Sequence, residues 1–402
     1  MAARDLAPDR LVGLDVARCL ALVGMVVTHV LDERARDGGV SVAHAVAAGR
    51  SAALFAVLAG VSLALMTGRR EPVHGRERLA RSAGTAVRAL LVAAVGLYLG
   101  GLGSGLAVIL TYYGLLFLLG LPFVGLRAPA LFTLAGVWLV VAPVVSHWVR
   151  PDLPQRGFDS PVFSDLAHPA QLASELALTG YYPVATWLAY LLTGLAVGRL
   201  DLGSRTVAAR LAVAGGALAV ASYAVSVALT SRDEVVAALV AGPPVLALTP
   251  TGLRDTIATG LPGTTPTGGP WEWLLVVVPH SGTPFDLAHT IGTSLLVIGV
   301  CLLATHGLRT SNRRAVAIAF GAGTMTLSLY TLHVVMRSPL LLPEEEPGAL
   351  GFHLVALLGL GALYVAGRRR GPLEWVVAAS SDRTAAVVRG RPEHEPERVA
   401  SP

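Results

Sequence analysis

The first apolar segment of the chain carries three ionisable residues whose spacing places them on one side of a helix. Asp15 and Arg18 are three residues apart, so they can pair on a helix surface. His29 follows Arg18 by eleven residues, which is close to three full turns and roughly 16 Å along the axis. Charged groups at the centre of a membrane helix cost roughly 2.5–3.5 kcal/mol each. This stripe should therefore face a protein interior or a water-filled cavity, with a cation to hold an anion and an imidazole to move a proton.

The second apolar segment adds another imidazole at the same end. Only fourteen residues lie between His29 and His44, so both rings should sit near the outer rim of adjacent helices. Either one could act as a general base near neutral pH. Arg50 lies about a turn and a half deeper, where it could stabilise an oxyanion or extend to the outer surface.

A third set of polar residues recurs at helical spacing near the C-terminal end of the chain. Thr326, Tyr330, His333 and Arg337 are four, three and four residues apart, so they share one face. Tyr330 is a second candidate for the oxyanion, and His333 is a candidate substrate contact, although interhelical hydrogen bonding is the simpler role. Three further potential metal ligands have no recognisable ligand spacing, so we expect no metal: His280, Asp286 and His289.

The composition places these residues in a membrane protein. Of 402 residues, 53% are apolar and only 14% are charged, against about 25% charged in soluble domains. This excludes an ordinary soluble enzyme and a disordered chain. All 31 basic residues are arginine, and the net charge of +5 favours loops facing anionic lipid over a nucleic-acid partner. Two cysteines inside apolar segments provide no disulfide framework.

Hydropathy predicts an all-α, polytopic bundle of about ten transmembrane helices, since each crossing needs about 20 apolar residues. If both termini are cytoplasmic, 21 arginines fall in inner segments and 7 in outer ones, which is the positive-inside pattern. We therefore expect a multi-pass plasma-membrane protein with both ends inside. The predicted spans are 11–31, 44–67, 85–101, 104–126, 128–149, 181–199, 207–229, 285–306, 315–341 and 349–367.

The chain is expected to form a single integral membrane domain over residues 1–375, with two long outer loops at 150–180 and 230–284. Residues 376–402 are polar and contain proline near the end, which predicts a cytoplasmic, disordered tail. The sequence is compatible with a homo-oligomer.

Two stretches resemble known membrane acyltransferases. The opening, RLVGLDVARCLALVGMVVTHV (10–30) followed by GRSAALFAVLAGVSLAL (49–65), resembles the heparan-alpha-glucosaminide N-acetyltransferase catalytic-domain family. Arg18 and His29, with ten residues between them, also match the acyltransferase-3 type. GTMTLSLYTLH (323–333) and RRGPLEW (369–375) resemble the bacterial YeiB-like family, so we divide the domain into an acyltransferase-like opening (1–100) and a YeiB-like part (280–375).

This resemblance implies transfer of an acetyl or other acyl group from acyl-CoA, supplied from the cytoplasm, to a sugar hydroxyl or amine outside. Arg18, paired with Asp15, would contact the donor, and His29 and His44 match the catalytic histidines of the two families. The expected partners are acyl-CoA, membrane lipid and a glycan or other outer acceptor. The pattern is imperfect, because Cys19 replaces the usual glycine after the arginine and Thr324 replaces an arginine.

The residues leave one rival of a different class. Ionisable groups inside spans, glycine-rich helices and long outer loops also fit a transporter or carrier of a small polar solute or lipid-linked glycan. A non-catalytic membrane scaffold would fit as well. Dependence on an acyl donor separates the enzyme from both, and no phosphate-loop motif supports use of ATP.

Overall fold

The computed structural model describes residues 10–155, 160–242, 249–341 and 349–390. These residues form an all-α assembly, in which the sole β pairing is an isolated bridge between Arg34 and Val40. Seven helical segments are long and apolar enough to cross a membrane, counting the short α2 and the following α3 as one. The prediction of an all-α polytopic membrane protein is confirmed. The seven are α1 (Val12–Val30), α2 (Val42–Ala47) with α3 (Arg50–Met66), α4 (Gly75–Gly100), α6 (Ala128–Val149), α9 (Arg205–Thr230), α12 (Pro284–Thr305) and α15 (Ala349–Ala366).

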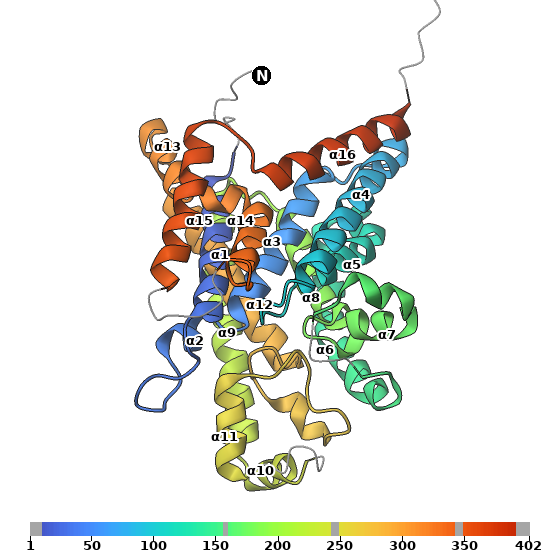
Figure 1. Ribbon diagram of the computed structural model, residues 1–402, viewed down its shortest axis with the longest axis vertical. Coiled ribbons are helices and arrows are strands. Elements are labelled where there is room, and N and C mark those ends of the chain that lie inside the picture. Colours follow the sequence, from blue (N-terminus) through green and yellow to red (C-terminus); the bar gives the residue numbers. More distant parts are fainter. Residues whose placement is uncertain (1–9, 156–159, 243–248, 342–348, 391–402) are drawn as a thin grey trace, which may run out of the picture.

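Three shorter apolar helices account for the other predicted spans: α5 (Leu110–Gly120), α8 (Val184–Gly198) and α14 (Thr326–Met336). The predicted outer loops contain α7 (Pro169–Ser174), α10 (Asp233–Val240) and α11 (Pro250–Thr259). Figure 1 shows α10 and α11 at the end of the molecule that also holds α2, while α13 (Thr310–Ala319) and α16 (Pro372–Arg389) lie at the opposite end.

Helix α8 is the centre of the bundle, and all of its residues except Ala185 are buried. It packs against α3, α5 and α6. Gly194 of α8 faces Val57 and Gly60 of α3 so closely that a Cβ at Gly194 would collide with the Val57 carbonyl oxygen. Small residues at such a crossing let two helix backbones approach, as in other membrane bundles.

The prediction of one span over 315–341 is wrong. The segment is divided into α13, a 3₁₀ turn (Gly321–Thr324) and α14. At the turn, a Cβ on Gly323 would overlap the Asp15 carbonyl oxygen, and one on Gly321 would meet that of Gly361. The regular helix is therefore interrupted at this turn, which packs between α1 and α15.

Residues 376–389, predicted as part of a disordered tail, are helical in α16, which packs along α4. The tail residues 391–402 lie outside the described residues. The GPLEW motif begins this helix and holds another in place. Glu374 accepts hydrogen bonds from the backbone N–H groups of Leu327 (2.7 Å) and Ser328 (3.1 Å), at the first turn of α14. A carboxylate at a helix N-terminus satisfies free N–H groups and complements the helix dipole.

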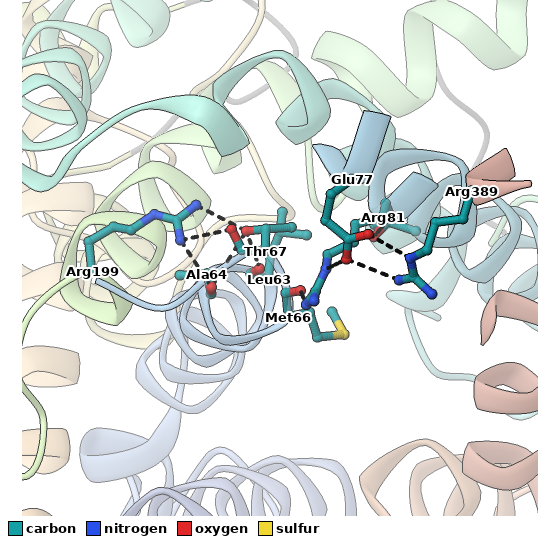
Figure 2. A network of polar contacts seen from close by, with 9 residues as sticks. Leu63, Ala64, Met66, Thr67, Glu77, Arg81, Arg199 and Arg389 are labelled. Carbon is teal, nitrogen blue, oxygen red and sulfur yellow. Dashed lines mark hydrogen bonds and ion pairs between the residues drawn. The ribbon is translucent and has the colours of Figure 1, made fainter. Parts of the chain in front are cut away.

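The C-terminal end of α3 is held by two arginines, which Figure 2 shows in one view. Arg199 donates to the carbonyl oxygens of Ala64 and Thr67, and Arg81 donates to that of Met66. Arg81 is paired with Glu77, which also binds Arg389 at the end of α16. Side chains from α4 and from the residue that follows α8 thereby add hydrogen-bond donors at the C-terminal end of a central helix.

Candidate functional site

A polar cavity of about 580 Å³ opens at the end of the molecule that holds α2 and α11. His29, at the end of α1, and His44, in α2, both line it. The structure therefore brings together the two imidazoles that the sequence singles out. We call this space the outer cavity; its other polar or aromatic lining residues include Glu33, Tyr112, Tyr181, Tyr182, His280 and Arg337.

One nitrogen of the His44 ring has a hydrogen-bond partner, and the other has none. Its Nε2 atom lies 2.6 Å from the carbonyl oxygen of Thr259, at the end of α11. A carbonyl oxygen only accepts, so Nε2 must carry the hydrogen of the neutral ring. The lone pair is then on Nδ1, which is buried and has no hydrogen-bond partner. An unpartnered buried acceptor on a residue that lines a polar cavity is a candidate general base.

His29 is engaged differently. Its Nδ1 lies 3.1 Å from Nε2 of His333 in α14, and Nδ1 of His333 lies 3.1 Å from Nδ1 of His353 in α15. His333 is completely buried. The structure thus places the predicted substrate contact His333 behind His29, while Nε2 of His29 is the nitrogen left for the cavity.

The sequence drew attention to His280 only as a metal-ligand candidate, yet it lines the outer cavity. Its backbone has a positive φ of 60°, and its ring contacts Tyr181 and Tyr182. Burial and the neighbouring His44 ring lower the pKa of His280 to about 4, so this third imidazole is neutral at physiological pH. No local signal in the sequence predicts these contacts.

A second, mainly apolar cavity of about 150 Å³ lies nearer the end that holds α16. Arg18 and Arg88 line it, together with Phe55, Tyr330 and Glu374. We call it the inner cavity. The predicted ion pair is confirmed, with Arg18 Nη1 3.0 Å from Asp15 Oδ1. Asp15 is bound on its other side by Arg10 at 2.8 Å, so Asp15 orients Arg18 behind the cavity wall.

The wall between the two cavities is the segment 108–113, at the start of α5. Ile109 and Tyr113 line the inner cavity, whereas Val108 and Tyr112 line the outer one. The Ile109 N–H donates to the Tyr330 hydroxyl oxygen at 3.4 Å. A hydroxyl that accepts one hydrogen bond can still donate its own hydrogen, which is what an oxyanion donor requires.

Arg50 does not join this site. It lies outside the set of described residues that line either cavity. Its Nε donates to Nε2 of His289 at 3.1 Å, and its Nη1 donates to the carbonyl oxygen of Ala45 at 2.9 Å. These contacts fasten the corner between α2 and α3, where Gly49 has a φ of 70°. The geometry gives Arg50 a structural role rather than the predicted oxyanion contact.

Within the described parts of the chain, no three His, Cys, Asp or Glu side chains are grouped so as to hold a metal ion. The residues that could act chemically are imidazoles, arginines and tyrosines. They suit proton transfer and anion binding.

Fold and cavities together define a polytopic membrane protein with an imidazole-lined cavity at one end and a mainly apolar cavity that holds two arginines toward the other. The chain belongs to the family described as heparan-alpha-glucosaminide N-acetyltransferase, catalytic, whose model matches residues 10–228. It is thus a member of a transmembrane acetyltransferase-like family. The match covers Arg18, His29 and His44 and ends before α14. A search of curated proteins finds no match.

Proposed function

We propose that this protein transfers an acyl group, acetyl in the simplest case, from acyl-CoA to a hydroxyl or amine of an acceptor in the outer cavity. The observation that carries the proposal is His44, which lines that cavity and whose buried Nδ1 has no hydrogen-bond partner. Family membership supplies the reaction class.

The chemistry follows from the positions of the groups. His44 Nδ1 takes the proton of the acceptor hydroxyl or amine, whose oxygen or nitrogen then attacks the thioester carbonyl carbon. The negative charge that develops on the carbonyl oxygen is stabilised by the Tyr330 hydroxyl at the wall. When the intermediate collapses, the carbon–sulfur bond breaks and CoA leaves as the thiolate. The proton that His44 Nδ1 received passes through solvent to this thiolate, so the thiol forms and the base is regenerated.

The acyl end of the donor would enter from the cytoplasm through the inner cavity, whose volume of about 150 Å³ is too small for the rest of acyl-CoA. A guanidinium is geometrically matched to phosphate and amide oxygens, which acyl-CoA carries in plenty. In this orientation, within the plasma membrane, both chain ends are cytoplasmic. The distribution of arginines supports it, as does the position of α13 and α16 at the end opposite α2 (Figure 1).

The direct test is incubation of the purified protein with acetyl-CoA, measuring the release of free thiol with and without glycans that carry free hydroxyls or amines. We expect thiol release that depends on the acceptor, and an acetylated product in equal amount. Transport of a polar solute into proteoliposomes, without any thiol release, would contradict the proposed transferase activity and support the carrier alternative.

Arg18→Gln should weaken acyl-CoA binding by roughly 10- to 100-fold, the loss of one hydrogen bond from a charged donor. Asp15 keeps Arg10 as a partner, so the substitution does not leave a buried carboxylate alone. Binding is measured by the thermal shift that acetyl-CoA produces. Arg314→Gln, an exposed substitution at the same end of the molecule, is the control. A folded Arg18→Gln protein with wild-type affinity would remove Arg18 from the donor site.

A further inference from the structure

Three imidazoles from three different helices form a chain that runs from the outer cavity into the bundle. The two contacts, His29 to His333 and His333 to His353, are both 3.1 Å. His333 and His353 are 0% and 1% exposed. The His29 and His333 rings are nearly parallel, at 8°, so an in-plane lone pair of one ring can meet an N–H of the other.

The middle ring ties the tautomers of the outer two together. A neutral imidazole has one N–H and one lone pair, and a charge on fully buried His333 would cost free energy. His333 uses both of its nitrogens, so it must donate on one side and accept on the other. If His353 donates to His333, then His333 donates to His29, and His29 carries its hydrogen on Nε2. If His353 accepts, every step is reversed and His29 has a lone pair on Nε2.

We propose that His333 and His353 are positioning residues that fix the orientation and tautomer of His29, and hence whether its Nε2 meets substrate as a donor or an acceptor. The proposal deepens the proposed function and rests on it for its catalytic consequence. The other titratable or charged groups that line the same cavity are Glu33, His44, Tyr112, Tyr181, Tyr182, His280 and Arg337.

The test removes the contact between His333 and His353 by a substitution at His353, which does not line the outer cavity. His353→Phe fills a similar space but cannot hydrogen-bond to His333, whereas His353→Asn retains a group able to donate or accept near the position of Nδ1. We expect His353→Phe to change the tautomer of His29, seen in its ¹⁵N chemical shifts, and to lower kcat about tenfold with little change in KM for the acceptor. The pH profile of kcat should change with it, and His353→Asn should restore most of both.

Phe352→Leu is the matched control, because Phe352 is the exposed neighbour on the same helix. Unchanged ¹⁵N shifts of His29 in a folded His353→Phe protein would overturn the proposal, whatever the activity. Changed shifts with a wild-type pH profile would overturn the link to catalysis. If the protein proves to have no transferase activity, the ¹⁵N measurement still decides whether the tautomers are coupled.

Discussion

Replacing His44 by glutamine should lower the rate of acyl transfer about 10²–10⁴-fold, the usual contribution of a general base. The substitution is chosen for its geometry. The terminal amide nitrogen of glutamine can occupy the place of Nε2 and continue to donate to the Thr259 carbonyl oxygen, a contact of 2.6 Å in the native protein. An amide offers no basic lone pair in place of Nδ1, so the base is lost while the link between α2 and α11 is kept.

Donor binding separates loss of the base from loss of the fold. His44 lines the outer cavity, whereas the donor is proposed to occupy the inner one, so the thermal shift produced by acetyl-CoA should be unchanged in His44→Gln. His168→Gln is the control, because His168 is an exposed histidine outside the residues that line the outer cavity. Near-wild-type transfer by a folded His44→Gln protein would exclude His44 as the base.

The local part of this site could be predicted from the sequence. The pairing of Asp15 with Arg18 depends only on helical spacing. The approach of His29 to His44 follows from a short connection between two helices. Such relations survive from sequence to structure because the positions involved are tied by one or two elements whose periodicity is strong.

The relations that could not be predicted are those between distant elements. The partner of His29 is 304 residues away, and that of His44 is a backbone oxygen 215 residues away. A single sequence holds no signal for a backbone carbonyl. The contact of Arg50 could not be predicted for a similar reason, since its partner His289 comes from α12, and only helix packing decides that they meet.

The error at 315–341 has another cause. A hydropathy average over a window does not show at which positions only glycine fits because a neighbouring backbone is too close for a side chain. Gly321 and Gly323 end the helix because neighbouring backbones occupy the space of a side chain. The helical tail was missed because α16 is polar along much of its length, as a helix lying on a membrane protein rather than crossing it can be.

The largest stability loss we expect comes from Arg199→Met. The side chain of Arg199 is only 4% exposed, and its guanidinium ends among acceptors at the end of α3 (Figure 2). Besides Ala64 and Thr67, it donates to the carbonyl oxygens of Arg69 (2.7 Å) and Val124 (2.5 Å), and to the Thr67 hydroxyl (3.0 Å). Methionine fills much of the volume but removes this donor from the carbonyl oxygens of Arg69 and Val124. The carbonyl oxygens of Ala64 and Thr67 keep backbone N–H donors. Each buried acceptor that loses its donor costs about 1–3 kcal/mol.

We therefore expect the free energy of unfolding to fall by roughly 3 kcal/mol or more in Arg199→Met, measured by denaturant unfolding in detergent micelles. Arg199→Lys should recover only part of the lost free energy of unfolding, because an ammonium keeps the charge but has three donors and no planar fork. Arg210→Met, at an exposed position of α9, is the control and should stay within about 0.5 kcal/mol of wild type. An Arg199→Met protein as stable as this control would contradict the assignment.

The same substitution links stability to the site. Ser62, one turn before the end of α3, accepts a hydrogen bond of 2.9 Å from Nη2 of Arg18. If the last turn of α3 frays when Arg199 is lost, the inner cavity loses part of the wall that orients Arg18. Arg199→Met should then weaken acetyl-CoA binding even at temperatures where the protein is folded, while the link between His44 and Thr259 at the opposite end is unaffected.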